Sequence, residues 1–151
     1  MTVPDRVTWR FEIPGQPPSW NASYKIVRKY RTTTTGKKVP FHTLAKEKPV
    51  IEYQDGARLI IQAAKPSRWA PDWQVRVYYW FFLSRDMDCD NIMKAINDSI
   101  EQATGVNDKR FLPCAMMKVI VPKAQAKVRV TIVDPGSDCA VLPLWGATQT
   151  P

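Results

Sequence analysis

The chain has 151 residues, enough for one domain with a sizeable core, and its 44% hydrophobic and 24% charged residues exclude an intrinsically disordered polypeptide. The 22 Lys and Arg residues outnumber the 14 Asp and Glu residues, and the net charge is +8 at pH 7. This surplus favours a polyanionic partner, with nucleic acid ahead of an anionic membrane surface, although a merely soluble basic protein has the same charge.

The N-terminal third predicts a strand and then a basic β-hairpin. Residues 8–13 alternate between apolar and polar side chains, and a Pro-Gly-Gln-Pro-Pro run ends this strand. Residues 24–30 are also extended in character, and the Thr-rich run at 32–38 is typical of a hairpin turn. The hairpin gathers many of the cations: Lys25, Arg28, Lys29, Arg31, Lys37 and Lys38. A solvated hairpin and an arm that follows nucleic-acid phosphates fit this pattern equally well.

The middle of the chain predicts a helix, a buried strand and a second helix. Apolar residues recur at helical spacing over residues 48–64, with Pro49 near the start. Residues 74–83 are the most apolar strand and are expected at the centre of the sheet. Residues 90–103 place Ile92, Ile96 and Ile100 on one face, with Asp90 as the expected N-cap and Gly105 as the end.

Two closing strands at 114–121 and 126–133 complete a single small α+β domain at residues 1–134, and residues 135–151 form a tail. The cysteines Cys89, Cys114 and Cys139 are odd in number and widely spaced, which predicts reduced thiols and no zinc finger. The start lacks the apolar core of a secretory signal, and the longest apolar run is far short of the ~20 residues of a membrane helix. We therefore expect a cytoplasmic protein without a membrane partner.

An acidic stretch, Asp86-Met87-Asp88-Cys89-Asp90-Asn91, stands out in this basic chain. It begins like an EF-hand calcium loop, but that loop needs Gly at its sixth position and Glu at its twelfth, where this chain has Asn91 and Asn97. Carboxylates at a helix N-terminus are stabilised by the helix dipole, which accounts for Asp90. The same effect does not account for Asp86 and Asp88.

A divalent metal is the simplest reason for carboxylates crowded on one side of an extended segment, since like charges repel unless a cation neutralises them. Oxygen ligands without a histidine cluster select Mg²⁺ or Mn²⁺, and the single histidine, His42, is expected to be structural. In a basic protein this points to phosphodiester chemistry. Lys94 follows Asp90 by one helical turn and is placed to stabilise a phosphate or to pair with Asp90, while Asp98 and Asp108 extend the polar set.

The acidic stretch and the residues after it resemble the signature of the RusA-type Holliday-junction resolvases. The matching residues are Asp88-Cys89-Asp90-Asn91-Ile92-Met93-Lys94, then Asp98, then Gly105-Val106-Asn107-Asp108. Residues 13–21, Ile-Pro-Gly-Gln-Pro-Pro-Ser-Trp-Asn, are similar to the first strand and Pro-Pro-Ser-x-Asn turn of that family. The resemblance covers about residues 8 to 134.

The resemblance implies a bacterial or phage-encoded α+β endonuclease with a mixed sheet, two main helices and a basic hairpin. It implies a homodimer that cuts four-way DNA junctions by paired symmetric nicks with Mg²⁺ or Mn²⁺, in DNA recombination and repair. Each cut would leave a 5′-phosphate and a 3′-hydroxyl. The implied metal carboxylates are Asp88, Asp90 and Asp108, and the implied catalytic lysine is Lys94. Asn91 and Asp98 match motif positions and are expected to support the site, to which we add Asn107 and the extra acid Asp86, as an outer-shell ligand or a solvated residue. Asn21 matches the N-terminal motif and is grouped with the basic residues that we expect to contact DNA: Lys25, Arg28, Lys29, Arg31, Lys37, Lys38, Lys109 and Arg110.

Two departures from the family pattern bear on these expectations. Asn107 occupies a position where the family usually has an acid, and Asp86 is an acid that the motif does not require. The alternatives are a nuclease of the same fold that prefers flaps or forks, a non-catalytic junction-binding module, and a structural basic protein with a capped helix. Metal-dependent cleavage separates a nuclease from a junction-binding module, and a structural basic protein would show neither DNA selectivity nor a metal effect.

Overall fold

Nine residues rich in β-branched and aromatic side chains form β4 (Val75–Leu83), the strand around which the rest of the chain is arranged. Its alternate residues, from Val75 to Leu83, are fully buried, and the residues between them are partly exposed. The computed structural model describes residues 7–19, 24–67, 69–71 and 73–134. Asn21 and the tail at 135–151 therefore lie outside the described residues.

Four strands make one mixed sheet in the order β1-β6-β4-β5. β6 (Lys127–Asp134) lies between β1 (Val7–Pro14) and β4 and is antiparallel to both, whereas β5 (Phe111–Ile120) runs parallel to β4 at the other edge. The prediction of a central β4 is confirmed. The two closing strands do not pair with each other, because β4 separates them.

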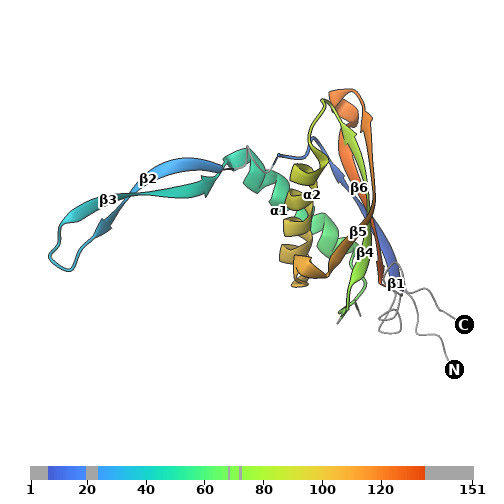
Figure 1. Ribbon diagram of the computed structural model, residues 1–151, viewed down its shortest axis with the longest axis horizontal. Helices are drawn as coiled ribbons and strands as arrows, with labels where there is room; N and C mark the ends of the chain where they lie inside the picture. Colours follow the sequence, from blue (N-terminus) through green and yellow to red (C-terminus); the bar gives the residue numbers. More distant parts are fainter. Residues whose placement is uncertain (1–6, 20–23, 68, 72, 135–151) are drawn as a thin grey trace, which may run out of the picture.

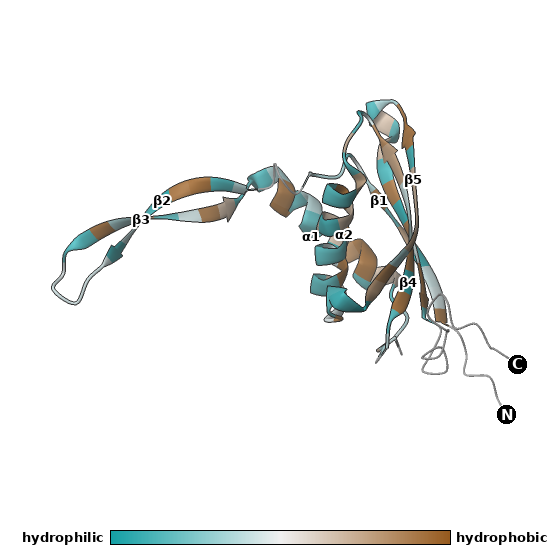
Figure 2. Cartoon of the chain, in the orientation of Figure 1, coloured by the Kyte–Doolittle hydropathy of each residue, from teal (hydrophilic) through white to brown (hydrophobic). Residues whose placement is uncertain are grey.

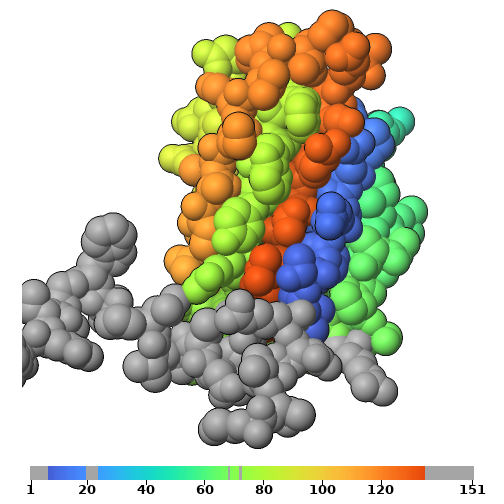
Figure 3. Space-filling view, turned by 90° about the vertical axis from the view of Figure 1, so that its right-hand side faces the viewer, coloured from blue at the N-terminus to red at the C-terminus, as the bar shows by residue number. Residues whose placement is uncertain are grey.

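Both helices cover one face of this sheet, α1 (Lys48–Ala64) and α2 (Cys89–Thr104) (Figure 1). Ile92, Ile96 and Ile100 of α2 are fully buried, as their spacing predicts, and each contributes about 1.5–3 kcal/mol through removal of its side chain from water. Figure 3 shows the opposite face, where β5, β4, β6 and β1 lie side by side and the visible part carries no helix. The sheet therefore has one packed face and one more open face.

The predicted hairpin is present as a separate two-stranded sheet of β2 (Tyr24–Thr32) and β3 (Lys38–Lys46). It projects away from the body from the N-terminal end of α1 (Figure 1). Gly36 adopts a left-handed backbone with φ of 77° in the tight connection, a conformation that a side chain disfavours. No helix in the described ranges is long and apolar enough to cross a membrane.

The sequence-based bounds of α1 match the structure, whereas α2 begins one residue earlier than expected. The N-cap of α2 is Asp88 and not Asp90, because the Asp88 carboxylate accepts a hydrogen bond from the backbone N–H of Asp90 at 3.1 Å. Gly105 ends α2 with φ of 74°, as predicted. Cys89 and Cys114 are free thiols, and Cys139 lies outside the described residues.

Candidate active site

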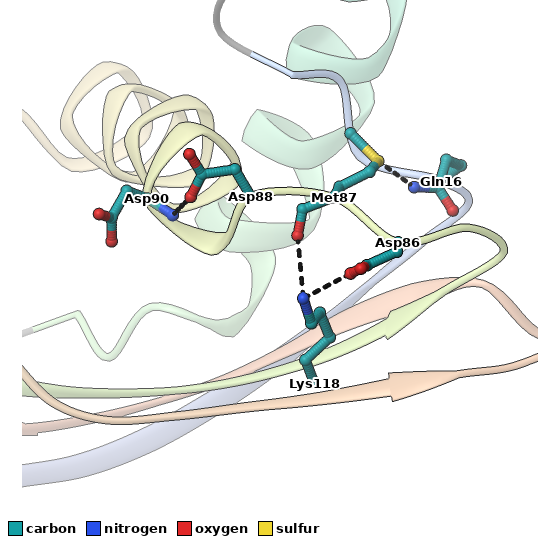
Figure 4. A network of polar contacts seen from close by, with 6 residues as sticks. All are labelled: Gln16, Asp86, Met87, Asp88, Asp90 and Lys118. Atoms are coloured by element: carbon teal, nitrogen blue, oxygen red, sulfur yellow. Dashed lines mark hydrogen bonds and ion pairs between the residues drawn. The ribbon is translucent and has the colours of Figure 1, made fainter.

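The acidic stretch forms the loop from the end of β4 to the start of α2. Asp88 uses both carboxylate oxygens locally: Oδ1 accepts from the backbone N–H of Asp90, and Oδ2 accepts from Nδ2 of Asn91, each at 3.1 Å. Asp88 and Asp90 are both exposed, and Figure 4 shows the Asp90 carboxylate turned away from that of Asp88. Because each carboxylate oxygen has more than one lone pair, these bonds orient Asp88 without using up its capacity to bind a cation.

Two contacts from distant parts of the chain hold this loop in place (Figure 4). Gln16, in the turn after β1, accepts hydrogen bonds from the N–H and Oγ–H of Ser84 at 2.7 and 2.9 Å and donates to the Met87 sulfur at 2.7 Å. Lys118 of β5 pairs with Asp86 and donates to the carbonyl oxygen of Met87. The turn and the edge strand therefore fix where α2 begins and where its first carboxylates lie.

The pair with Lys118 gives Asp86 a structural partner. The hydrogen bond from Lys118 lowers the pKa of Asp86 below its ordinary value, and the same contact raises the pKa of Lys118. Both groups are exposed, so this ion pair contributes little to the free energy of unfolding. Its geometric effect is to tie the acidic loop to β5.

Lys94 and Asp98 continue the polar face of α2 at intervals of one turn from Asp90. Burial raises the pKa of Asp98 above its ordinary value; Lys46 and Lys94 oppose that rise, and Asp108 and Glu101 add to it. Asp98 therefore has two cations, Lys46 and Lys94, and two further carboxylates, Glu101 and Asp108, as electrostatic neighbours.

Asp108 stands at the opposite end of α2 from Asp88 and Asp90. It begins a short 3-10 turn, Asp108–Arg110, which follows Gly105 and folds back along the last turns of the helix. About 12 Å of helix separates the position of Asp90 from that of Asp98, the electrostatic neighbour of Asp108. Across the described ranges, no three His, Cys, Asp or Glu residues come close enough to hold one metal ion. Within one chain, Asp88 and Asp90 lie at the start of α2, whereas Asp108 follows its end.

Asn107 has a definite local role at this turn. Its Oδ1 accepts from the backbone N–H of Lys109 at 3.1 Å, and its Nδ2 donates to the Glu101 carboxylate at 3.1 Å. A carboxylate at this position would keep the first bond and lose the second, because it has no proton to donate at neutral pH. The amide therefore orients Asp108 against the end of α2.

The cations that the sequence assigns to DNA occupy two separate places. Six of them lie on the hairpin, where Lys25 pairs with Glu47 at 3.1 Å. The other two, Lys109 and Arg110, follow Asp108 directly in the 3-10 turn. Sequence reasoning missed the positioning contacts of Gln16 and Lys118; the Pro-Gly-Gln-Pro-Pro turn was the available signal for Gln16, and no local signal marked Lys118.

Comparisons with known proteins agree with the motif. The family described as Endodeoxyribonuclease RusA matches residues 14–132. No curated protein matches the chain. Among solved structures, 2C-methyl-D-erythritol 2,4-cyclodiphosphate synthase from Plasmodium vivax is similar over 85% of this chain and 95% of its own, with 10% identity and a TM-score of 0.36. A likeness at that level carries no argument about fold or function.

Proposed function

Because the chain belongs to the RusA endodeoxyribonuclease family, we propose that it is a metal-dependent nuclease that resolves four-way DNA junctions by paired symmetric nicks. Family membership supports endonuclease action on junction DNA. The observation that carries the metal dependence is the pair of exposed carboxylates, Asp88 and Asp90, held at the start of α2 in a chain of net charge +8. Exposed carboxylates repel DNA phosphates, so their presence at this surface favours a bound cation over DNA binding alone.

The carboxylates of one chain provide part of the ligand set that a hard divalent cation needs. Asp88 and Asp90 would supply two carboxylates to Mg²⁺ or Mn²⁺, and Asp108 is the third by the family motif. When bound, the ion would supply charge neutralisation at the attacked phosphate and activation of the attacking water. Lys94, one turn beyond Asp90, places an ammonium on the same helical face, where it can bind a phosphate oxygen.

The missing third carboxylate supports a homodimer with a shared site. A two-fold axis that sets two α2 helices antiparallel would bring Asp88 and Asp90 of one chain to Asp108 of the other. Each dimer would then hold two equivalent sites, as paired nicks in opposite strands require. In this arrangement a single chain has no complete site, which agrees with the separation of the carboxylates along α2.

The edge of the sheet formed by β5 is the surface that fits this dimer. Among the described residues, β5 has a partner strand on one side only, and five of its large apolar side chains are 43–55% exposed: Leu112, Met116, Met117, Val119 and Ile120. A ten-residue apolar edge of this kind is a template for pairing with another strand. We place the second copy of the chain on it, with the two β5 strands antiparallel.

Charge at the two ends of β5 agrees with antiparallel pairing. Lys109 and Arg110 directly precede the strand, whereas Lys118 near its end holds the loop that carries Asp86 and Asp88. Antiparallel strands would set the basic start of one β5 against the acidic loop beside the end of the other. The same pairing moves Asp108 of one chain toward the first carboxylates of its partner.

The test is cleavage of a labelled four-way junction, with duplex, flap and fork DNA as controls, in Mg²⁺, Mn²⁺ or EDTA. Wild type is compared with Asp90→Asn and with Asp55→Asn, which removes an exposed carboxylate from α1. We expect paired nicks with either metal for wild type and Asp55→Asn, and none in EDTA or for Asp90→Asn. Tight junction binding without nicks under any metal would instead identify a binding module, and faster cleavage of flaps or forks would identify a different branched substrate.

A further inference from the structure

The hairpin of β2 and β3, here called the arm, comprises residues 24–46 and forms a sheet separate from the four-stranded sheet of the body. Each strand has nine residues, so the arm reaches about 30 Å from α1 (Figure 1). An isolated two-stranded hairpin is marginally stable in water. Figure 2 shows hydrophobic segments in both of its strands. Among the described residues, the arm therefore exposes apolar surface that is available to a bound partner.

The register of the arm separates its side chains into two faces. Side chains alternate along a strand, so Lys25, Lys29 and Arg31 share one face, which we call the basic face and which also carries Phe41 opposite Lys29. The other face, here called the apolar face for its three large exposed side chains, carries Ile26 opposite Leu44 and Tyr30 opposite Pro40, with Arg28 opposite His42 between these pairs. Ile26, Leu44 and Tyr30 are 72%, 66% and 59% exposed, and Arg28 lies 5.4 Å from the Tyr30 ring centre.

Charge decides which partner suits these faces. Residues 24–46 contain seven Lys and Arg residues and no Asp or Glu. A second copy of a chain with net charge +8 would be repelled by this surface, whereas the phosphates of DNA are attracted to it. Apolar side chains that protrude among such cations gain nothing from the charged phosphates, and DNA-binding proteins use side chains of this kind as wedges between base steps, which unstack.

The root of the arm lies beside the candidate active site. Lys46 donates to the buried Gln54 of α1 at 2.8 Å, lies 6.0 Å from the Tyr24 ring centre, and acts electrostatically on Asp98 of α2. DNA bound along the arm is thereby led toward the polar face of α2, which carries Lys94. The arm is placed to select the DNA that reaches the carboxylates.

We propose that the apolar face of the arm, formed by Ile26, Tyr30 and Leu44, wedges against unstacked bases at the branch point of DNA. The basic face holds the phosphates that flank them. This assigns two functions to one element: Lys29 and Arg31 supply affinity that is independent of DNA shape, and Ile26 and Leu44 supply the preference for branched over continuous duplex DNA. The inference rests on the proposed junction substrate and adds how that substrate is recognised.

The experiment measures binding in EDTA, so that cleavage does not interfere, to a four-way junction and to duplex DNA over a range of salt concentrations. The junction carries 2-aminopurine beside the branch point, whose fluorescence rises when the base unstacks. Three variants are compared with wild type: Ile26→Thr with Leu44→Thr, Lys29→Gln with Arg31→Gln, and Leu59→Gln, which removes a 64% exposed leucine from α1 as a control. Threonine keeps the β-propensity of the arm.

Substitutions on the two faces of the arm should change DNA binding in different ways. We expect the Ile26 and Leu44 variant to lose about tenfold in junction affinity, with no loss for duplex, an unchanged salt dependence and no rise in fluorescence. The Lys29 and Arg31 variant should weaken junction and duplex equally and reduce the slope of log affinity against log salt by about 2. The Leu59 variant should resemble wild type.

Three results would overturn the wedge. The first is a junction preference and fluorescence rise retained by the Ile26 and Leu44 variant, which would leave the proposed nuclease function standing. The second is a loss of the dimer in that variant without DNA, measured by light scattering, which would assign the apolar face to the second chain. The third is wild type that binds junction and duplex equally, which would remove the junction substrate itself.

Discussion

The shared site makes a quantitative prediction for mixtures of two inactive variants. Asp90→Asn removes a carboxylate from the start of α2, and Asp108→Asn removes one from the opposite end. Each homodimer of either variant lacks a complete site and should not cut. In a heterodimer, the Asp90→Asn chain lends its intact Asp108 to the intact Asp88 and Asp90 of its partner. One of the two sites in that heterodimer is therefore wild type, while the other lacks both carboxylates.

The expected recovery follows from random assortment of subunits. Equal amounts of the two variants, unfolded and refolded together, give about half heterodimers, each with one intact site of two. Nicking should return to about a quarter of the wild-type rate per chain. Because a heterodimer cuts one strand only, the product should be nicked junctions and not resolved duplexes. Denaturing gels count the nicks, and native gels separate nicked from resolved DNA.

A second mixture is the matched control. Asp88→Asn and Asp90→Asn alter the same end of α2, so every heterodimer of these two variants has one lost carboxylate in each site, and no activity should return. Light scattering establishes that dimers form in both mixtures. If dimers form and the Asp90→Asn and Asp108→Asn mixture stays inactive, each site is built within one chain and the shared site is wrong. Recovery in both mixtures would point to contamination by wild type.

Three further predictions follow from contacts within one chain. Gln16→Ala removes the hydrogen bonds that hold Ser84 and Met87, so junction cleavage should fall about tenfold or more. The control, Gln62→Ala, changes an exposed glutamine of α1 and should leave cleavage unchanged. An equal effect of both variants would show that Gln16 does not position the loop. Ile96→Ala opens a cavity in the fully buried face of α2 and should lower the free energy of unfolding by about 2–5 kcal/mol in urea titrations, and a loss below about 1 kcal/mol would show that this face is loosely packed. Asp98→Asn should stabilise the protein at pH 7, because burial raises the pKa of Asp98 in the folded state and its ionised carboxylate therefore destabilises the fold. In urea titrations, the gain in the free energy of unfolding should shrink as the pH falls through the folded-state pKa toward the ordinary value of 3.8. A variant that is less stable than wild type at pH 7 would contradict the raised pKa.

Local patterns predicted the elements of the fold well. The periodicity of residues 48–64 gave the bounds of α1, and the spacing of Ile92, Ile96 and Ile100 gave the buried face of α2. Both signals lie within one element and depend on side chains three or four positions apart. The N-cap was wrong by two residues because Asp88 and Asp90 are both good caps, and only the backbone geometry decides between them.

Long-range contacts escaped the same reasoning. Gln16 binds Ser84 across 68 positions of sequence, and no local pattern links the two residues. The parallel pairing of β5 with β4 was equally hidden, since a strand after a helix can join either edge of a sheet. The motif groups Asp88, Asp90 and Asp108, whereas the fold sets Asp108 after the end of α2 and the other two at its start, a separation that order along the chain does not reveal.

Asn107, which stands where the RusA family usually has an acid, fits the local fold of this chain. Its amide accepts from Lys109 and donates to Glu101, so it holds the turn on which Asp108 stands. An aspartate there would face Glu101, with Asp98 and Asp108 nearby, and repulsion among these carboxylates would loosen the turn. The amide avoids that repulsion at a point where one chain has no compensating metal site. In the proposed shared-site dimer, the neutral residue would keep Asp108 in place for the two carboxylates of the partner subunit.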